Sequence, residues 1–244
     1  MRQRPKLRTV EKYQPPFPLN QFPKGFGLQV GKEIIYLLAT RNTTRFEGND
    51  WEESFARAIE GRWKPSNVGL DDVLLEQTAW SAKTVKHKNP ATARKVRLIS
   101  GRNSPSYSYD ADVIQKSDPN EIGEMILAIW NERVAAIRAK YQHLRTVVLV
   151  KSEDLLEVAI FEFDTVLYDI TAYEWTWNKK NNLEGRDKAG NQHHFTWQRS
   201  GAQFTIIKDL PESRLALRLR QPPALEPDAV LETMGFDSSW VKVI

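Results

Sequence analysis

Cysteine is absent from all 244 residues of the sequence, which excludes disulfides, thiolate zinc sites, iron–sulfur clusters and cysteine nucleophiles. The chain also has no apolar run near the roughly 20 residues that a membrane span needs, and residues 1–27 lack the apolar stretch of a secretory signal. We therefore expect a protein without a membrane segment that works in a reducing cytoplasm.

Several motifs of common enzymes are missing as well. The phosphate-binding patterns G-x-x-x-x-G-K-[ST] and G-x-G-x-x-G do not occur, and neither does the G-x-S-x-G elbow of serine hydrolases. His193 and His194 are adjacent, so on a strand they would face opposite ways and make a poor zinc pair. ATP-driven, dinucleotide-dependent and serine-hydrolase chemistry therefore have no support in the sequence.

The charge of the chain is mildly basic overall and unevenly distributed. The formal net charge is +4, which is too small to identify a partner. Residues 77–109 contain no aspartate or glutamate. Their seven basic residues are Lys83, Lys86, Lys88, Arg94, Lys95, Arg97 and Arg102. Such a stretch forms either a solvated basic edge or a surface that contacts phosphate groups.

The hydrophobic periodicity predicts one α/β domain preceded by an arm. Residues 1–30 contain five prolines and indicate an extended basic arm without stable internal structure, whereas residues 31–244 indicate a single domain. Its core, at about 45–150, has the order helix, hairpin, strand, helix, buried strand, and a β-rich part follows at about 151–220. The core elements are expected at 51–63, 70–86, 95–100, 119–141 and 145–150.

The hairpin carries the strongest chemical signal. Asp71 and Asp72 begin its first strand, and Lys83 lies on its second. A turn at Glu76-Gln77 places residue 72 opposite residue 81, so Asp72 and Lys83 meet at one end of the sheet. A carboxylate can hold Mg²⁺, which polarises a phosphate, and a lysine orients the attacking water or offsets charge on phosphorus. The pattern favours metal-dependent phosphodiester hydrolysis over an exposed hairpin with a salt bridge.

The hairpin and its neighbours resemble the PD-(D/E)XK nuclease superfamily over about residues 45–208. Three segments, DDVLLEQTAWSAKTVK, VRLISGRNSPSYSY and HHFTWQRSGAQFTII, are more narrowly similar to type II restriction endonucleases. The resemblance implies a restriction-endonuclease-like core, a mixed sheet flanked by helices, with a β-rich C-terminal elaboration. It also implies Mg²⁺-dependent cleavage of a short specific double-stranded DNA sequence, in which Asp72 would bind metal and Lys83 would act on the attacking water. A homodimer, a cognate DNA methyltransferase as genetic partner and a prokaryotic cytoplasm follow from the same resemblance.

The sequence departs from the superfamily at one position. The acid expected two residues before the lysine is Ser81 here, so a second metal-binding carboxylate must come from elsewhere. Glu53 on the preceding helix is the first candidate for this catalytic and metal-binding role, and Glu76 in the turn is its substitute. Asp71 stays an alternative metal ligand to Asp72, because neighbours on a strand point to opposite faces.

Polar side chains in two stretches are candidates for DNA contact. Residues 173–203 mix aromatic residues with Lys, Arg, Asn and Gln, the side chains that read base edges. We expect the aromatic residues there to pack mostly in the core and the polar residues to point mostly outward. The Ser-rich loop at 100–108 suits phosphate contact. The candidate DNA-binding residues are Lys86, Arg102, Asn103, Lys179, Lys180, Gln198 and Arg199.

Three other functions are compatible with these features. A repair or nicking nuclease of the same fold would share the metal dependence but ignore sequence. A non-catalytic DNA-binding module, in which Ser81 marks a decayed site, would bind DNA in a salt-dependent way without cutting it. A basic globular protein with no nucleic-acid role would neither bind nor cut DNA.

Overall fold

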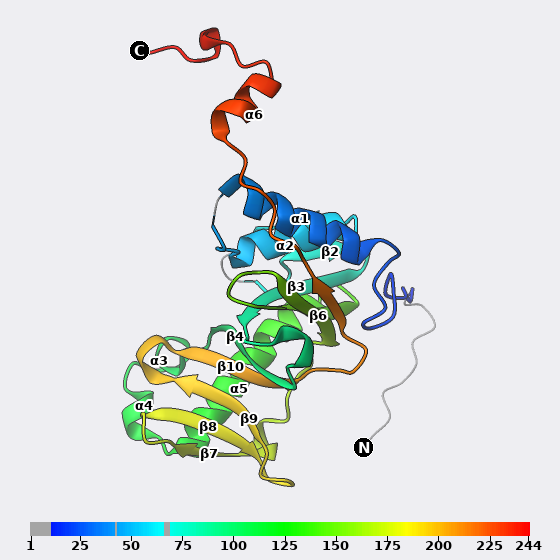
Figure 1. The fold of residues 1–244 in the computed structure, drawn as a ribbon. Helices are drawn as coiled ribbons and strands as arrows, with labels where there is room; N and C mark the ends of the chain where they lie inside the picture. Colours follow the sequence, from blue (N-terminus) through cyan, green and yellow to red (C-terminus); the bar gives the residue numbers. More distant parts are fainter. Residues whose placement is uncertain (1–10, 42, 66–68) are drawn as a thin grey trace.

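Two β-sheets organise the chain, which the computed structural model describes at residues 11–41, 43–65 and 69–244 (Figure 1). Sheet A has the strand order β1-β2-β3-β5-β6-β11. Its strands β3 and β5 run parallel and its other described pairs are antiparallel, so the sheet is mixed. The strands are β1 (Arg62–Trp63), β2 (Val73–Leu75), β3 (Thr78–Lys86), β5 (His143–Lys151), β6 (Glu157–Asp164) and β11 (Leu215–Arg218).

Sheet B is antiparallel throughout its described strands and has the order β4-β10-β9-β8-β7. Its strands are β4 (Lys95–Arg102), β7 (Tyr173–Trp177), β8 (Asn182–Asp187), β9 (His193–Gln198) and β10 (Gln203–Asp209). The strand at 95–100 was expected inside the core sheet, but it pairs with β10 and begins sheet B. In sheet A, β3 therefore lies directly beside β5.

Helices cover both faces of sheet A. α1 (Phe26–Arg41) and α2 (Gly48–Ala58) bury Ile34 and Phe55 in one cluster with Trp80 of β3. On the opposite face, α5 (Pro119–Arg138) joins the two sheets, because its Trp130 shares a second cluster with Ala79 of β3 and Phe204 of β10. The short helices are α3 (Pro105–Ser108), α4 (Val113–Lys116), α6 (Pro227–Thr233), and the 3₁₀ turns η1 (Pro90–Thr92), η2 (Ile170–Ala172), η3 (Arg199–Gly201) and η4 (Ser238–Trp240). The predicted α/β class is thus confirmed. None of the helices in the described ranges combines the length and apolarity needed to cross a bilayer.

Strand β5 is buried on both faces, as its continuous apolar sequence predicts. Val147 and Leu149 point into the cluster under α1 and α2. Val148 and Val150 point the other way, into a third cluster that contains Leu98 of β4. Because successive side chains of β5 point to opposite faces, this strand packs against the α1–α2 layer on one side and against the edge of sheet B on the other.

Capping explains where α5 begins. Asp118 accepts hydrogen bonds from the backbone N–H groups of Asn120 (2.7 Å) and Glu121 (3.0 Å), and the Glu121 carboxylate accepts one from the N–H of Asp118 (3.0 Å). Pro119 occupies the first turn, where its missing N–H costs nothing. The predicted helix start is confirmed.

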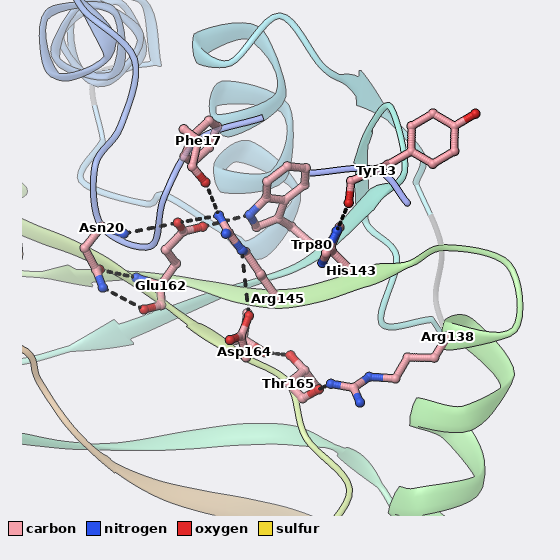
Figure 2. A network of polar contacts seen from close by, with 11 residues as sticks. Tyr13, Phe17, Asn20, Trp80, Arg138, His143, Arg145, Glu162, Asp164 and Thr165 are labelled. Atoms are coloured by element: carbon pink, nitrogen blue, oxygen red, sulfur yellow. Dashed lines mark hydrogen bonds and ion pairs between the residues drawn. The ribbon is translucent and has the colours of Figure 1, made fainter. Parts of the chain in front are cut away.

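The proline-rich arm is not free of structure in its described part, and helix α1 begins within it. Residues 11–25, the strap, pack across β5 and β6 (Figure 2). Phe17 is buried, with its ring 5.8 Å from that of Trp80, and its carbonyl accepts a hydrogen bond from Arg145 (2.9 Å). The Asn20 side chain bonds the backbone of Glu162. Aromatic residues between the prolines therefore anchor the strap, whereas residues 1–10 of the predicted arm lie outside the described residues.

Three features of the fold differ from the sequence prediction: the division between the sheets, the end of α2 and the presence of strand β8. The division near residue 150 does not separate the sheets, because β4 belongs to sheet B while β6 and β11 belong to sheet A. The helix expected at 51–63 ends at Ala58, and Trp63 belongs to β1. Strand β8 was not predicted, since Asn182–Asp187 is mostly polar and its strand conformation depends on pairing with β7 and β9.

Candidate active site

The hairpin β2–β3 positions the first acidic residue of the site. It turns at Glu76-Gln77 and pairs Val73 with Trp80, which confirms the predicted register. Asp72 lies just before β2, and its Oδ2 accepts hydrogen bonds from the Ala82 N–H (2.9 Å) and the Ser81 hydroxyl (3.3 Å). The backbone pairing of β2 with β3 ends at Val73 and Trp80, and beyond it the Asp72 carboxylate accepts the hydrogen bond of the next inward-pointing N–H group of β3. These two bonds fix the orientation of the Asp72 side chain.

Lys83 brings a positive charge to this carboxylate. Its Nζ lies 3.6 Å from Oδ2 of Asp72, and the lysine side chain is about three-quarters buried. Residues 81 and 83 share one face of β3 because side chains alternate along a strand. The predicted meeting of Asp72 and Lys83 at one end of the sheet is confirmed.

The second acidic residue at the site is Glu52, on α2. Its buried carboxylate accepts a hydrogen bond from the Trp63 indole N–H (3.1 Å). Burial raises the pKa of Glu52, the Trp63 hydrogen bond lowers it, and the charges of Asp72 and Lys83 act on it in opposite directions. These interactions place Glu52 in the same electrostatic cluster as the Asp72–Lys83 pair.

Glu53, the residue expected from the sequence, lies elsewhere. Its carboxylate is 2.5 Å from the Arg57 guanidinium on the outer surface of α2, in an i,i+4 pair, and it is well exposed. Successive helical residues are about 100° apart, so only one of two adjacent glutamates can face the sheet. Of the two adjacent glutamates, Glu52 is therefore the one that is buried and that interacts electrostatically with Asp72 and Lys83.

The two alternative metal ligands also fall outside the cluster. Asp71 is buried, but its carboxylate pairs with Lys64 at 2.5 Å, because it points opposite to Asp72. Glu76 is exposed in the turn and has a left-handed backbone, with φ of 51°. Of the adjacent aspartates, Asp72 is the one beside Lys83.

Burial dominates the electrostatics of the cluster. It raises the pKa of Asp72, while Lys83, the Ala82 N–H and the Ser81 hydroxyl lower it in part. Two buried carboxylates with raised pKa values therefore act on each other electrostatically. Carboxylates with perturbed pKa values are concentrated at functional sites, because burying a carboxylate costs stability and catalysis often needs the shifted pKa.

Arg133 of α5 is a further basic residue of this region. Burial lowers the pKa of its guanidinium and the charge of Asp72 raises it. The guanidinium donates to the Ser100 carbonyl (3.1 Å) and to Oδ1 of Asn103 (3.0 Å) at the end of β4. These contacts hold the Arg133 side chain between α5 and the edge of sheet B.

Histidines offer no metal site. His194 lies 3.1 Å from Asp187, and His193 contacts the Phe195 carbonyl and Thr196. Across the described residues, no group of three or more His, Cys, Asp and Glu side chains could hold a metal ion. Asp72 and Glu52 are the carboxylates here that could serve Mg²⁺, since this ion is commonly held by one or two carboxylates together with substrate phosphates and water.

The predicted DNA-binding residues of sheet B gather at one end of that sheet. Gln203 lies opposite both Arg102 of β4 and Gln198 of β9, and Gln198 lies opposite Asn182 of β8. The exposed residues of this end, here called the basic end, are Arg102, Lys179, Lys180, Gln198 and Arg199. Strand pairing therefore brings together residues from three separate parts of the chain.

Two of the predicted DNA contacts lie outside the basic end. Lys86 is exposed at the carboxyl end of β3, where it pairs with Glu153 at 2.7 Å beside a recess of about 460 Å³. Asn103 is fully buried, and its amide donates to the Ile126 carbonyl (3.1 Å), so its prediction as a DNA contact is wrong. Asn103 instead accepts a hydrogen bond from Arg133 and so connects the basic end to α5.

Aromatic residues near the basic end belong to the core, as predicted. Trp175, Phe195 and Trp197 are all buried, and the Trp197 indole N–H donates to the Asn103 carbonyl (2.7 Å).

Comparisons of the chain with protein-family models, curated proteins and solved structures gave no match in any of the three.

Proposed function

We propose that this protein is a Mg²⁺-dependent type II restriction endonuclease of the PD-(D/E)XK superfamily, acting on a short specific sequence in double-stranded DNA. The observation that carries the proposal is the Asp72–Lys83 pair at 3.6 Å on one hairpin, whose charges both act on the buried Glu52. The superfamily's missing acid at Ser81 is then supplied from α2. A prokaryotic cytoplasm, a homodimer and a protecting methyltransferase belong to the same proposal.

Each residue of the cluster has a defined task in this reaction. Asp72 and Glu52 would hold Mg²⁺, which when bound polarises the scissile phosphate and lowers the pKa of a water molecule. Lys83 orients the attacking water and offsets negative charge that develops on the phosphate oxygens. The Ala82 N–H and the Ser81 hydroxyl fix the Asp72 carboxylate, so little reorganisation is needed when substrate arrives.

The basic end of sheet B supports the choice of DNA as substrate. Arg102, Lys179, Lys180 and Arg199 bring positive charge, and Gln198 brings an amide that can read adenine. Asn103 and Arg133 connect this end to the Asp72 cluster through hydrogen bonds and charge. The proposal requires that a duplex bound at the basic end present one of its phosphates to Lys83.

The nuclease proposal is tested by digesting several unmodified phage DNAs with the purified protein, in Mg²⁺ and in EDTA. We expect discrete fragments in Mg²⁺ and intact DNA in EDTA, because cleavage at a fixed sequence leaves defined ends. Mapping those ends gives the recognition sequence and the cut position. A Mg²⁺-dependent smear would replace the restriction enzyme by a non-specific nuclease, and intact DNA that still binds the protein would indicate a binding module.

Replacing Glu52 by glutamine is expected to lower the cleavage rate about 100-fold or more and to raise the Mg²⁺ concentration needed for half-maximal rate, because it removes one of the two carboxylates proposed to hold the metal. The amide keeps the Trp63 hydrogen bond but removes the negative charge beside Asp72. Cleavage assays over a Mg²⁺ titration measure both effects.

Glu53→Gln is the matched control, because it makes the same chemical change one residue away on the exposed face of α2. It should cut DNA at nearly the wild-type rate. Equal loss of activity in both variants, or loss in Glu53→Gln alone, would contradict the assignment of Glu52.

A further inference from the structure

Residues 225–244, here called the tail, leave the body of the protein at the carboxyl end of α1. The Leu225 N–H donates to the Ala39 carbonyl (2.9 Å), and the described hydrogen bonds beyond it join residues of the tail to one another. Figure 1 shows α6 and the turn after it projecting away from both sheets. Within the described structure, the tail therefore has no core of its own to pack against.

The tail nevertheless has the composition of a buried segment. Met234, Trp240 and Val243 are 63%, 60% and 93% exposed. Phe236 and Trp240 stack edge to face, with ring centroids 5.6 Å apart, and both rings remain exposed. The large apolar side chains exposed in the tail are Leu225, Leu231, Met234, Phe236, Trp240, Val241, Val243 and Ile244. Exposed apolar side chains gathered in one segment in this way are typical of a surface that another protein covers.

A second exposed apolar surface lies on α1, close to the root of the tail. Leu28 and Tyr36 are 67% and 61% exposed, and Ile35 is exposed beside them. These positions are seven and eight residues apart, so they share one face of the helix, with Lys32 between them. We call Leu28, Lys32, Ile35 and Tyr36 the α1 stripe.

The two surfaces are complementary in charge. The tail has four carboxylates and one lysine: Glu226, Asp228, Glu232, Asp237 and Lys242. Around the α1 stripe, Lys24 and Lys32 have no ion pair within the described residues, and Glu33 lies 3.4 Å from Arg57, which it shares with Glu53. An acidic apolar segment therefore fits a basic apolar helix face.

We propose that the tail of one copy of this chain docks on the α1 stripe of a second copy, and that the second tail docks reciprocally on the first. Identical copies that exchange the same two surfaces form a closed two-fold dimer. The direction of the tail favours a second copy over the same chain. Glu226 is extended and Pro227 begins α6, so the chain continues outward past α1. A return to its own stripe would require a reversal at this point.

Single cysteines test the proposal cleanly, because the chain has none of its own. One protein carries Tyr36→Cys and the other Trp240→Cys, and the two are mixed under mild oxidation. We expect an inter-chain disulfide, seen as a band of twice the chain mass on a non-reducing gel. Ala189→Cys, in the exposed turn between β8 and β9, replaces Tyr36→Cys in the control mixture and should give no such band above background.

A chain that carries both Tyr36→Cys and Trp240→Cys distinguishes the two modes of docking. An internal disulfide, which changes mobility without doubling the mass, would overturn the proposal in favour of docking within one chain. Light scattering of the unmodified protein at micromolar concentration should give twice the chain mass. The variant Trp240→Asp/Val243→Asp should give the mass of a single chain.

Charge reversal provides a test that a merely unstable variant cannot mimic. Lys24→Glu/Lys32→Glu should weaken the dimer at least tenfold, and adding Asp228→Lys/Glu232→Lys/Asp237→Lys should restore it. A monomeric unmodified protein, or a dimer unaffected by all these changes, would overturn the proposal. The assays use no DNA, so their outcome is independent of the proposed nuclease activity.

Discussion

Asp72→Asn is expected to lower the kcat/KM for DNA cleavage by about 10³-fold or more, while the protein stays folded. A metal-holding carboxylate contributes several kcal/mol to transition-state stabilisation, and about 4 kcal/mol corresponds to a factor of 10³. Asparagine keeps an oxygen that can accept from the Ala82 N–H and the Ser81 hydroxyl, so the hairpin geometry is retained. Initial rates on a plasmid with a mapped site give the loss of activity.

The stability of Asp72→Asn should depend on pH in a defined direction. Burial raises the pKa of Asp72 in the folded protein, so the acid stabilises the fold only while it is protonated. This contribution is present below the pKa of the unfolded chain and is lost as pH rises through the higher folded pKa. At neutral pH the neutral variant should therefore unfold at an equal or higher temperature than the wild type, and the difference should shrink in acid.

Asp71→Asn is the control for both measurements. Asp71 lies next in sequence but points away and pairs with Lys64. This variant should lose stability, because it removes the charge that the buried Asp71 carboxylate pairs with Lys64, and should cut DNA within a few-fold of the wild-type rate. Full activity in Asp72→Asn, or equal losses in both variants, would remove the hairpin from the active site.

Arg145→Met is expected to produce a large loss of stability, about 3–5 kcal/mol in the free energy of unfolding. Arg145 and Glu162 form an ion pair at 2.9 Å with side chains only 4% and 0% exposed. The Glu162 carboxylate also accepts a hydrogen bond from the Trp80 indole N–H (2.9 Å). Arg145 donates a second hydrogen bond to the Phe17 carbonyl of the strap (Figure 2). Removing the cation leaves a buried carboxylate without its partner. Urea unfolding measures the loss.

Two further variants separate charge burial from simple loss of contacts. The double variant Arg145→Met/Glu162→Met should recover most of the loss, because it leaves no buried charge. Arg138→Met removes an arginine whose guanidinium bonds the Thr165 carbonyl near the surface, and should cost about 1 kcal/mol. A double variant no more stable than Arg145→Met would show that the contacts of the pair matter more than its charges.

The loss in the free energy of unfolding caused by Arg145→Met should also grow as pH rises through the acid range. Burial already raises the pKa of Glu162, the Trp80 hydrogen bond and the charge of Arg145 lower it, and loss of Arg145 raises it further. A raised carboxyl pKa gives stability that is present at low pH and lost as pH rises through the folded value. Unfolding at mildly acidic pH should therefore show the smaller difference from the wild type.

The central pair of the site could be predicted from sequence because it depends on local geometry alone. A two-residue turn fixes the register of a hairpin, and the register decides that residue 72 lies opposite residue 81. The same reasoning gave the start of α5 and the buried strand β5, whose signals also lie within a few residues. Helix α1 has a regular pattern too, at Phe26, Val30, Ile34 and Leu38, but the preceding prolines concealed it.

The second carboxylate was missed for a different reason. Glu52 and Glu53 are adjacent, and only the helical phase distinguishes them. Glu52 shares a face with the buried residues Phe55, Ala56 and Ile59, so the sequence did contain the signal. Arg133 and Asn103 had no such signal, because the covering of α5 by sheet B depends on the distant pairing of β4 with β10.

The strap couples segments that are far apart along the chain. Tyr13 bonds Gln142, Phe17 bonds Arg145 and Asn20 bonds Glu162, across separations of 128 to 142 residues. Closing a loop of that length costs entropy before any contact compensates for it, so we expect these bonds to form late in folding. The Trp80 ring, against which Phe17 packs, would then stay open to water on that side until the strap docks. During synthesis, the first strands of sheet A therefore wait for more than half of the chain before their core can close.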